Sequence, residues 1–230
     1  MKSAPNLAKK DVISVLGCVI FLLMNLGAIG SGGRRRAKEM VCLSNLRQWS
    51  TVFQMHTQDN NGYFRFGDPV WMEELRPYYK DLRLLLCSVA TQTGEKIGRP
   101  RSFQAWSYKG NYVGSYGING WVDDNVATSI YNMPVFAGMF GVNAWPNESE
   151  HPPDLSIPNE KPVEMHIVCV DRHNGAVNHL FMDWSVRKVG LKELWTLKWH
   201  RQFDTEGPWT KAGGVQPSDW PEWMRNFKDY

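Results

Sequence analysis

The sequence predicts an α+β protein in which a long amino-terminal helix packs on a small antiparallel β-sheet domain. Three observations favour this fold. An uncharged stretch from Val12 to Gly30 is followed by helical periodicity up to about residue 58. The remaining residues are rich in Gly, Pro and Asn, with short β-branched runs between turn signals. A chain of 230 residues, 43% apolar and 21% charged, suits one globular domain and an appendage.

Residues 12–30 are predicted to form a transmembrane helix. The stretch VISVLGCVIFLLMNLGAIG has Asn25 as its only strongly polar residue. As a helix it would be about 28 Å long, close to the ~30 Å hydrocarbon core of a bilayer. Residues 1–11 would then be a short cytoplasmic amino terminus. The arginines directly after the span, taken alone, would keep the following domain in the cytoplasm.

Two other interpretations of this stretch stay open. Small residues at Ala28 and Gly30, after the apolar run, are typical of a cleaved signal peptide. The sequence Val15-Leu16-Gly17-Cys18 resembles a lipoprotein signal. Cys18 lies near the start of the apolar run, however, whereas a lipidated cysteine would follow it.

An amphipathic helix is predicted over residues 31–58, as an extension of the first. The run Asp59-Asn60-Asn61-Gly62 ends it, because Asn and Gly accept left-handed backbone conformations. Apolar residues recur at intervals of three and four, which defines one helix face. That face carries Cys42, Leu46, Trp49, Phe53 and His56. Burying the leucine, the tryptophan and the phenylalanine against the sheet would contribute roughly 1.5–3 kcal/mol each.

Residues 59–230 are predicted to form the globular domain. Its carboxyl-terminal part contains a hairpin at 163–190, in which Asn174-Gly175 forms a tight turn. The expected strands of this region cover residues 162–171, 176–183 and 185–190. The expected helical segments cover residues 71–79 and 191–203, with a helical turn from Asp219 and a strand or helix end at 82–87.

Charge and aromatic content limit the classes of partner. A net charge of +3 is too small to indicate nucleic-acid binding. The chain has 11 tryptophans, and seven of them follow Gly141. Such residues either fill a core or form a contact surface, and core packing is the commoner role.

Cysteines in the globular part permit two states. Cys42, Cys87 and Cys169 could be buried, inert thiols. Alternatively, Cys42 and Cys87 could form a disulfide in an oxidising compartment. Closing that loop of about 45 residues would stabilise the fold by ~4 kcal/mol in the chain-entropy model.

Polar residues of the hairpin could form a metal site, but turns explain them better. The candidate ligands suit zinc, and they are His166, Asp171, His173, His179 and Asp183. Strand alternation would send the first two to opposite faces of the strand. An aspartate at a turn, such as Asp183, can accept backbone N–H bonds without binding a metal.

Oxygen-rich runs and catalytic motifs give little support for other sites. Asp59-Asn60-Asn61 and Asp123-Asp124-Asn125 could hold calcium, but they lack the spacing of an EF-hand loop. The sequence contains no G-x-S-x-G motif, phosphate-binding glycine loop or H-E-x-x-H motif. A non-enzymatic protein without a cofactor is therefore predicted.

Motifs at both ends of the chain resemble a known family. The apolar stretch leads into RRRAKEMVCLSNLRQW and then QDNNGYF, and two motif residues near the other end stand ten positions apart. This pattern is similar to bacterial type II secretion pseudopilin-like proteins, which have a prepilin-type amino terminus and a His-x9-Asp-Gly motif. Trp184 replaces the motif glycine, and SYGING and Cys87 lie where relatives carry similar elements. The matching motif residues are Cys42, Asn45, Leu46, His173 and Asp183.

The amino terminus departs from the family pattern. Counting back from Cys42, the slot of the family's conserved glutamate falls on Asp11, which would be the assembly acid. The glycine slot of the cleavage site falls on Asn6, and Leu7 would begin the mature chain. The slots that follow are apolar in the family but hold lysines here. We therefore expect that the leader is not cleaved efficiently.

The resemblance also implies a location and a function. Pseudopilins are single-pass proteins of the inner membrane whose pilin-like domain is exported to the periplasm, and export would favour the Cys42–Cys87 disulfide. The predicted function is structural assembly in or beside a type II secretion pseudopilus. The expected partners are the lipid bilayer and other pseudopilin-like or secretion components. The alternative is a membrane-anchored envelope module whose aromatic loops, 136–145 and 195–223, stack on carbohydrate or another polymer.

Overall fold

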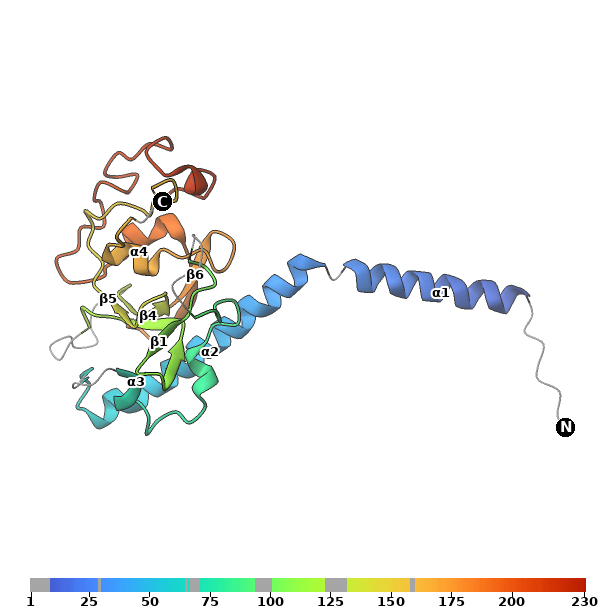
Figure 1. The fold of residues 1–230 in the computed structure, drawn as a ribbon, viewed down its shortest axis with the longest axis horizontal. Helices are drawn as coiled ribbons and strands as arrows, with labels where there is room; N and C mark the ends of the chain where they lie inside the picture. The colour runs from blue at the N-terminus through green and yellow to red at the C-terminus, as the bar shows by residue number, and fades with distance from the viewer. Residues whose placement is uncertain are drawn as a thin grey trace. The chain divides into compact units, whose positions relative to one another are not determined.

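The structure is a computed structural model. It describes residues 9–28, 30–64, 66, 71–93, 101–122, 132–157 and 160–230, without the side chains of 22–28 and 31. The chain forms two compact units, Met1–Lys38 and Glu39–Tyr230. The ribbon in Figure 1 shows the helices and strands of both units.

The first unit contains helix α1, Lys9–Ala28, which begins with Lys9, Lys10 and Asp11. Among the helices of the described residues, none is long and apolar enough to cross a membrane. Residues 22–28 are helical, but their side chains lie outside the described part.

The structure corrects three sequence predictions. The lack of a membrane-spanning helix among the described residues contradicts the transmembrane helix over residues 12–30. It also contradicts the single-pass location in the inner membrane. The single long amino-terminal helix is also wrong, because α1 ends at Ala28 and a separate helix, α2, covers Ser31–Asp59. Gly32 and Gly33 lie in the first turn of α2, and glycine has a low helix propensity.

Helix α2 confirms the predicted amphipathic face. All five residues of that face are buried, and Leu46, Trp49 and Phe53 are 0% exposed. The helix ends where the Asn–Gly run predicts, because Asn61 and Gly62 have φ values of 57° and 84°. The Gly62 N–H donates to the Thr57 carbonyl over 2.7 Å, which satisfies one of the last helix carbonyls.

The second unit contains a five-stranded sheet with the strand order β5-β3-β4-β6-β7. Its strands are β3 (Tyr116–Asn119), β4 (Pro134–Gly138), β5 (Asn143–Ala144), β6 (Ala176–Phe181) and β7 (Val186–Gly190). The β5 strand runs parallel to β3, and the other pairs are antiparallel. The sheet is therefore mixed, which corrects the predicted antiparallel sheet. A separate pair joins β1 (Trp106–Tyr108) to β2 (Tyr112–Gly114).

The predicted hairpin is partly correct. Strands β6 and β7 lie at the two later predicted runs, and Asn174 and Gly175 have positive φ values of 57° and 74°. The predicted strand over 162–171 is instead helix α4, Glu164–Val168. A long-range contact explains this helix, because the Glu150 carboxylate accepts the backbone N–H groups of Glu164 and Met165. A carboxylate at a helix amino terminus satisfies donors that have no partner within the helix.

The remaining helical segments are shorter than expected. The region 191–203 has only a 3₁₀ helix, η2, at its start. The short segments are α3 (Trp71–Glu74), η1 (Leu82–Leu85), η2 (Leu191–Thr196) and η3 (Glu222–Met224).

Two apolar cores lie on the two faces of the sheet. Residues of β6 alternate between them, so that Leu180 packs in one core with α2 and Val177 packs in the other. In the first core, the Trp49 ring lies 5.1 Å from the Phe136 ring, measured between centroids. The second core also encloses Lys192, whose side chain is 0% exposed.

Candidate functional site

Three buried side chains from distant segments meet beneath α2: Cys42, Cys87 and His173. Their sulfur and imidazole donor atoms all lie within 4.8 Å of one another. The Cys87 Sγ atom is 3.7 Å from His173 Nε2. The group contains the predicted motif residues Cys42 and His173. Its third member, Cys87, is the predicted disulfide partner of Cys42.

Each segment of the cluster is held by local structure. Cys42 lies on the buried face of α2. Cys87 follows η1, and its backbone N–H donates to the Ser115 hydroxyl over 2.7 Å. His173 precedes the β-turn before β6, where the Asp171 carboxylate accepts the Gly175 N–H over 2.7 Å. The hydrogen bond within this turn therefore holds the His173 backbone next to the sheet.

Buried polar groups surround the two sulfur atoms. The Tyr116 hydroxyl donates to Cys42 Sγ over 3.1 Å. Arg172 is 5% exposed, and its guanidinium donates to the carbonyls of Ser115, Gln104 and Met139. The Asn178 amide lies beside Cys42 and lowers the pKa of that thiol through a hydrogen bond. Its side-chain atoms have no other hydrogen-bond partner among the described residues.

The two thiols are driven to different protonation states. The hydrogen bond from Cys42, followed by contributions from His173 and the Arg172 charge, lowers the pKa of Cys87 to about 4 despite its burial. The same hydrogen bond raises the pKa of Cys42, and burial adds to that rise. The cluster is therefore suited to a thiolate at Cys87 that accepts a hydrogen bond from the Cys42 thiol.

The predicted Cys42–Cys87 disulfide stays a prediction. Both cysteines are free thiols in this structure, and so is the buried Cys169. Their sulfur atoms lie within 4.8 Å of each other. A disulfide requires a separation of ~2.05 Å.

The other predicted motif residues have structural contacts. Asp183 is exposed, and its carboxylate accepts the Ser185 backbone N–H and hydroxyl, as expected for a turn aspartate. Asn45 donates to the Leu86 carbonyl over 3.0 Å, which ties α2 to the residue before Cys87. Asp11 is exposed in the first turn of α1. His173 and Asp183 thus perform separate roles.

The predicted calcium runs receive little support. The Asp59 carboxylate accepts the Tyr78 hydroxyl over 2.8 Å, at the end of α2. The run Asp123-Asp124-Asn125 lies outside the described residues.

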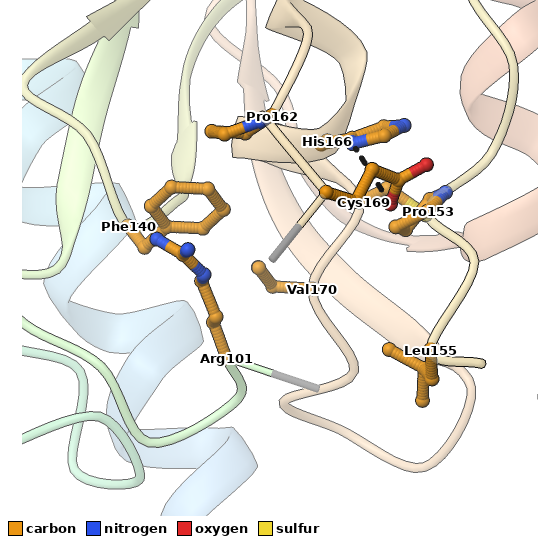
Figure 2. Close-up of a pocket in the computed structure, with 9 residues that line it drawn as sticks. Arg101, Phe140, Pro153, Leu155, Pro162, His166, Cys169 and Val170 are labelled. Carbon is orange, nitrogen blue, oxygen red and sulfur yellow. Dashed lines mark ion pairs between the residues drawn. The ribbon is translucent and has the colours of Figure 1, made fainter. Parts of the chain in front are cut away.

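A second group joins the predicted candidate His166 to His151 and Glu160, which the sequence did not indicate. Their donor atoms lie within 4.8 Å of one another. Figure 2 shows His166 at a small cavity of about 30 Å³, with a dashed line for its ion pair with Glu160. Such a volume holds about one or two waters rather than an organic substrate. The sequence did not predict this group because His151 and Glu160 lie outside the helices and strands, at a spacing that matches no known ligand motif.

Most late tryptophans serve packing. Trp195, Trp199 and Trp220 are at most 2% exposed. The Trp223 indole N–H donates to the Pro153 carbonyl over 2.8 Å. Trp209, Trp220 and Trp223 also line an open groove of about 840 Å³, the place where the alternative polymer-binding function would be located. Trp145 is the most exposed tryptophan among the described residues, at 40%.

Comparison of the chain with family models, with curated proteins and with solved structures finds no match. The predicted resemblance to pseudopilin-like proteins therefore has no support beyond the motifs themselves.

His179, a predicted metal candidate, is fully buried on the opposite face of β6, beside Trp199. Burial lowers its pKa to about 3. The unfolded chain, with a histidine pKa of about 6.5, binds a proton that the folded chain excludes, so this stabilisation is present above pH 6.5 and is lost as the pH falls.

We expect the free energy of unfolding to fall by roughly 2 kcal/mol between pH 7 and pH 5 through this residue. His179→Leu should remove that part of the pH dependence, because leucine cannot be protonated. Urea unfolding of both proteins at the two pH values measures the difference. An identical pH dependence in the variant would show that His179 is not the responsible group.

Proposed function

We propose that this chain is a non-enzymatic, pilin-like assembly protein of a type II secretion-type system, and that copies associate through helix α1. The observation that carries the proposal is the apolar surface of this helix. Its exposed side chains include Ile13 at 70% and Phe21 at 68%. A helix that is apolar on most sides is normally covered by other apolar surfaces.

The arrangement of apolar side chains favours helical neighbours on more than one side. The exposed large apolar residues of α1 are Val12, Ile13, Val15, Leu16, Val19, Ile20 and Phe21. At about 100° per residue, Ile13 and Val15 point in directions about 160° apart. One copy could therefore contact two others, which is the geometry that an open assembly requires.

The globular second unit, Glu39–Tyr230, here called the head, supports the same proposal. In the head, α2 packs its apolar face in the first core, and its other side carries exposed residues such as Arg47. The Asp11 carboxylate at the start of α1 would pair with a basic group of a neighbouring copy.

Cysteine cross-linking in living cells tests the assembly. Cys18 is exposed on α1, whereas the other three cysteines are buried, so Cys18→Ser gives a background without reactive thiols. In that background, Ile13→Cys or Val15→Cys alone should give cross-linked dimers with a bismaleimide. The double variant, with both cysteines, should give a ladder of higher multimers, because each chain can then be linked to two neighbours.

A matched control is Lys211→Cys, which places an exposed cysteine on the head. It should give monomers. Recovery of monomers from all variants, or of dimers alone from the double variant, would contradict assembly through α1. Lys211→Cys can also be combined with Ile13→Cys or with Val15→Cys. If these double variants give the same ladder as the α1 double variant, the cross-linking reflects unspecific aggregation. That result would also contradict the proposal.

A further inference from the structure

We propose that Cys42, Cys87 and His173 bind a zinc ion. Two thiolates and one imidazole are donor types of structural zinc sites, in which protein ligands fill all four coordination positions. The three residues are 1%, 0% and 4% exposed, respectively. They come from three segments that are far apart in the sequence, so an ion bound to all three would tie these segments together.

The distances fit a tetrahedral ion. Zinc bonds of ~2.3 Å to sulfur and ~2.0–2.1 Å to nitrogen, at the tetrahedral angle, place the two ligand atoms about 3.6 Å apart. The Cys87 Sγ to His173 Nε2 distance is 3.7 Å. The same bonds place two sulfur atoms about 3.8 Å apart, and all three donor atoms lie within 4.8 Å of one another.

Asn178 provides an independent observation that points to a ligand. Its side chain is 0% exposed and lies on the face of β6 that carries Leu180. Apart from a hydrogen bond to Cys42 that lowers the pKa of that thiol, the amide has no hydrogen-bond partner among the described residues. Leaving a buried polar atom unpaired costs about 1–3 kcal/mol. In this proposal the Asn178 oxygen takes the fourth position on the zinc, with the amide orientation set by the ion.

The surroundings supply the outer contacts of a metal site. The Tyr116 hydroxyl donates to Cys42 Sγ, and hydrogen bonds of this kind orient a thiolate ligand. On binding, the sulfur–zinc bonds replace any remaining sulfur–proton bonds, and those protons leave to solvent. No electron transfer occurs, and both sulfur atoms stay reduced.

The group of His151, Glu160 and His166 carries a weaker case. The His166 Nε2 atom lies 2.9 Å from the His151 carbonyl, and His151 Nδ1 lies 3.0 Å from the Pro152 carbonyl. The Glu160 carboxylate accepts the Asp154 N–H. These hydrogen bonds already give the group structural partners.

Metal content and cobalt spectroscopy of the full chain test the proposal. The protein, purified under reducing conditions without chelators, should contain about one zinc per chain by elemental analysis. After removal of zinc, Co²⁺ alone should produce a thiolate-to-cobalt charge-transfer band, and zinc should abolish it. Cys42→Ser and Cys87→Ser should lose most of the band, and His173→Ala should bind cobalt at least tenfold more weakly.

Cys169→Ser is the matched control, because Cys169 is an equally buried free thiol in the other core. It should keep both the zinc and the cobalt band. The zinc content and the cobalt band are measured on the wild-type protein. The test therefore does not depend on whether the serine variants fold. Absence of both zinc and the cobalt band in the folded, reduced protein would overturn the proposal. A Cys42–Cys87 disulfide in protein taken directly from its cells would overturn it too.

Discussion

Replacing Trp49 by alanine is expected to lower the free energy of unfolding by about 4 kcal/mol. Trp49 is 0% exposed on the inner face of α2. Its ring centroid lies 5.5 Å from that of Trp71 and 4.8 Å from that of Tyr79. Removing the ring leaves a cavity between helix and sheet, and it leaves the Leu84 carbonyl without the indole N–H that it accepts over 2.9 Å.

Urea unfolding followed by far-UV circular dichroism measures this loss. Trp145→Ala is the matched control, because Trp145 is 40% exposed and its truncation should cost less than about 1 kcal/mol. A loss below 1 kcal/mol for Trp49→Ala would show that α2 does not anchor the first core, and would undermine the packing of the helix on the sheet.

Asp229→Ala is expected to cost about 3 kcal/mol, because it leaves a buried ammonium without its counter-charge. The Lys192 side chain is 0% exposed, and its Nζ lies 2.6 Å from the Asp229 carboxylate. The Lys192 ammonium also donates to the Arg225 carbonyl and lies over the Trp220 ring. Neither contact neutralises the charge.

The reverse change should be mild. Lys192→Met keeps the volume in the core, and the Asp229 side chain, 31% exposed, can turn to water. The double variant should therefore be about as stable as Lys192→Met alone. Urea unfolding of all four proteins gives the interaction energy of the pair. Additive effects of the two changes would show that the ammonium does not depend on Asp229.

The sequence was most informative where one local pattern decided the structure. The apolar face of α2 is set by intervals of three and four residues, and its end is set by Asn61 and Gly62. The turn that leads into β6 is set by Asn174-Gly175 in the same way. These features depend on neighbours in the chain, so they can be read without knowledge of the fold.

Long-range contacts explain what the sequence did not predict. The β-branched run around Ile167 suggests a strand, but the Glu150 carboxylate, distant in the sequence, favours helix α4 there. The cysteine–histidine cluster was only half visible. Each member was singled out, but nothing in their spacing showed that Cys87 approaches His173 rather than that His173 approaches Asp183. The uncharged stretch around α1 also led to the transmembrane prediction, which the structure contradicts for the described residues.

Trp184 has a φ of 67°, a conformation that favours glycine. A bulky residue in this conformation carries about 1–3 kcal/mol of strain. Its ring packs 5.8 Å from the Phe64 ring, between centroids, and its carbonyl accepts the Ser50 hydroxyl. The aromatic contact thus holds this turn in a conformation that costs free energy. A smaller residue at position 184 would relieve that strain but would leave the space beside Phe64 unfilled.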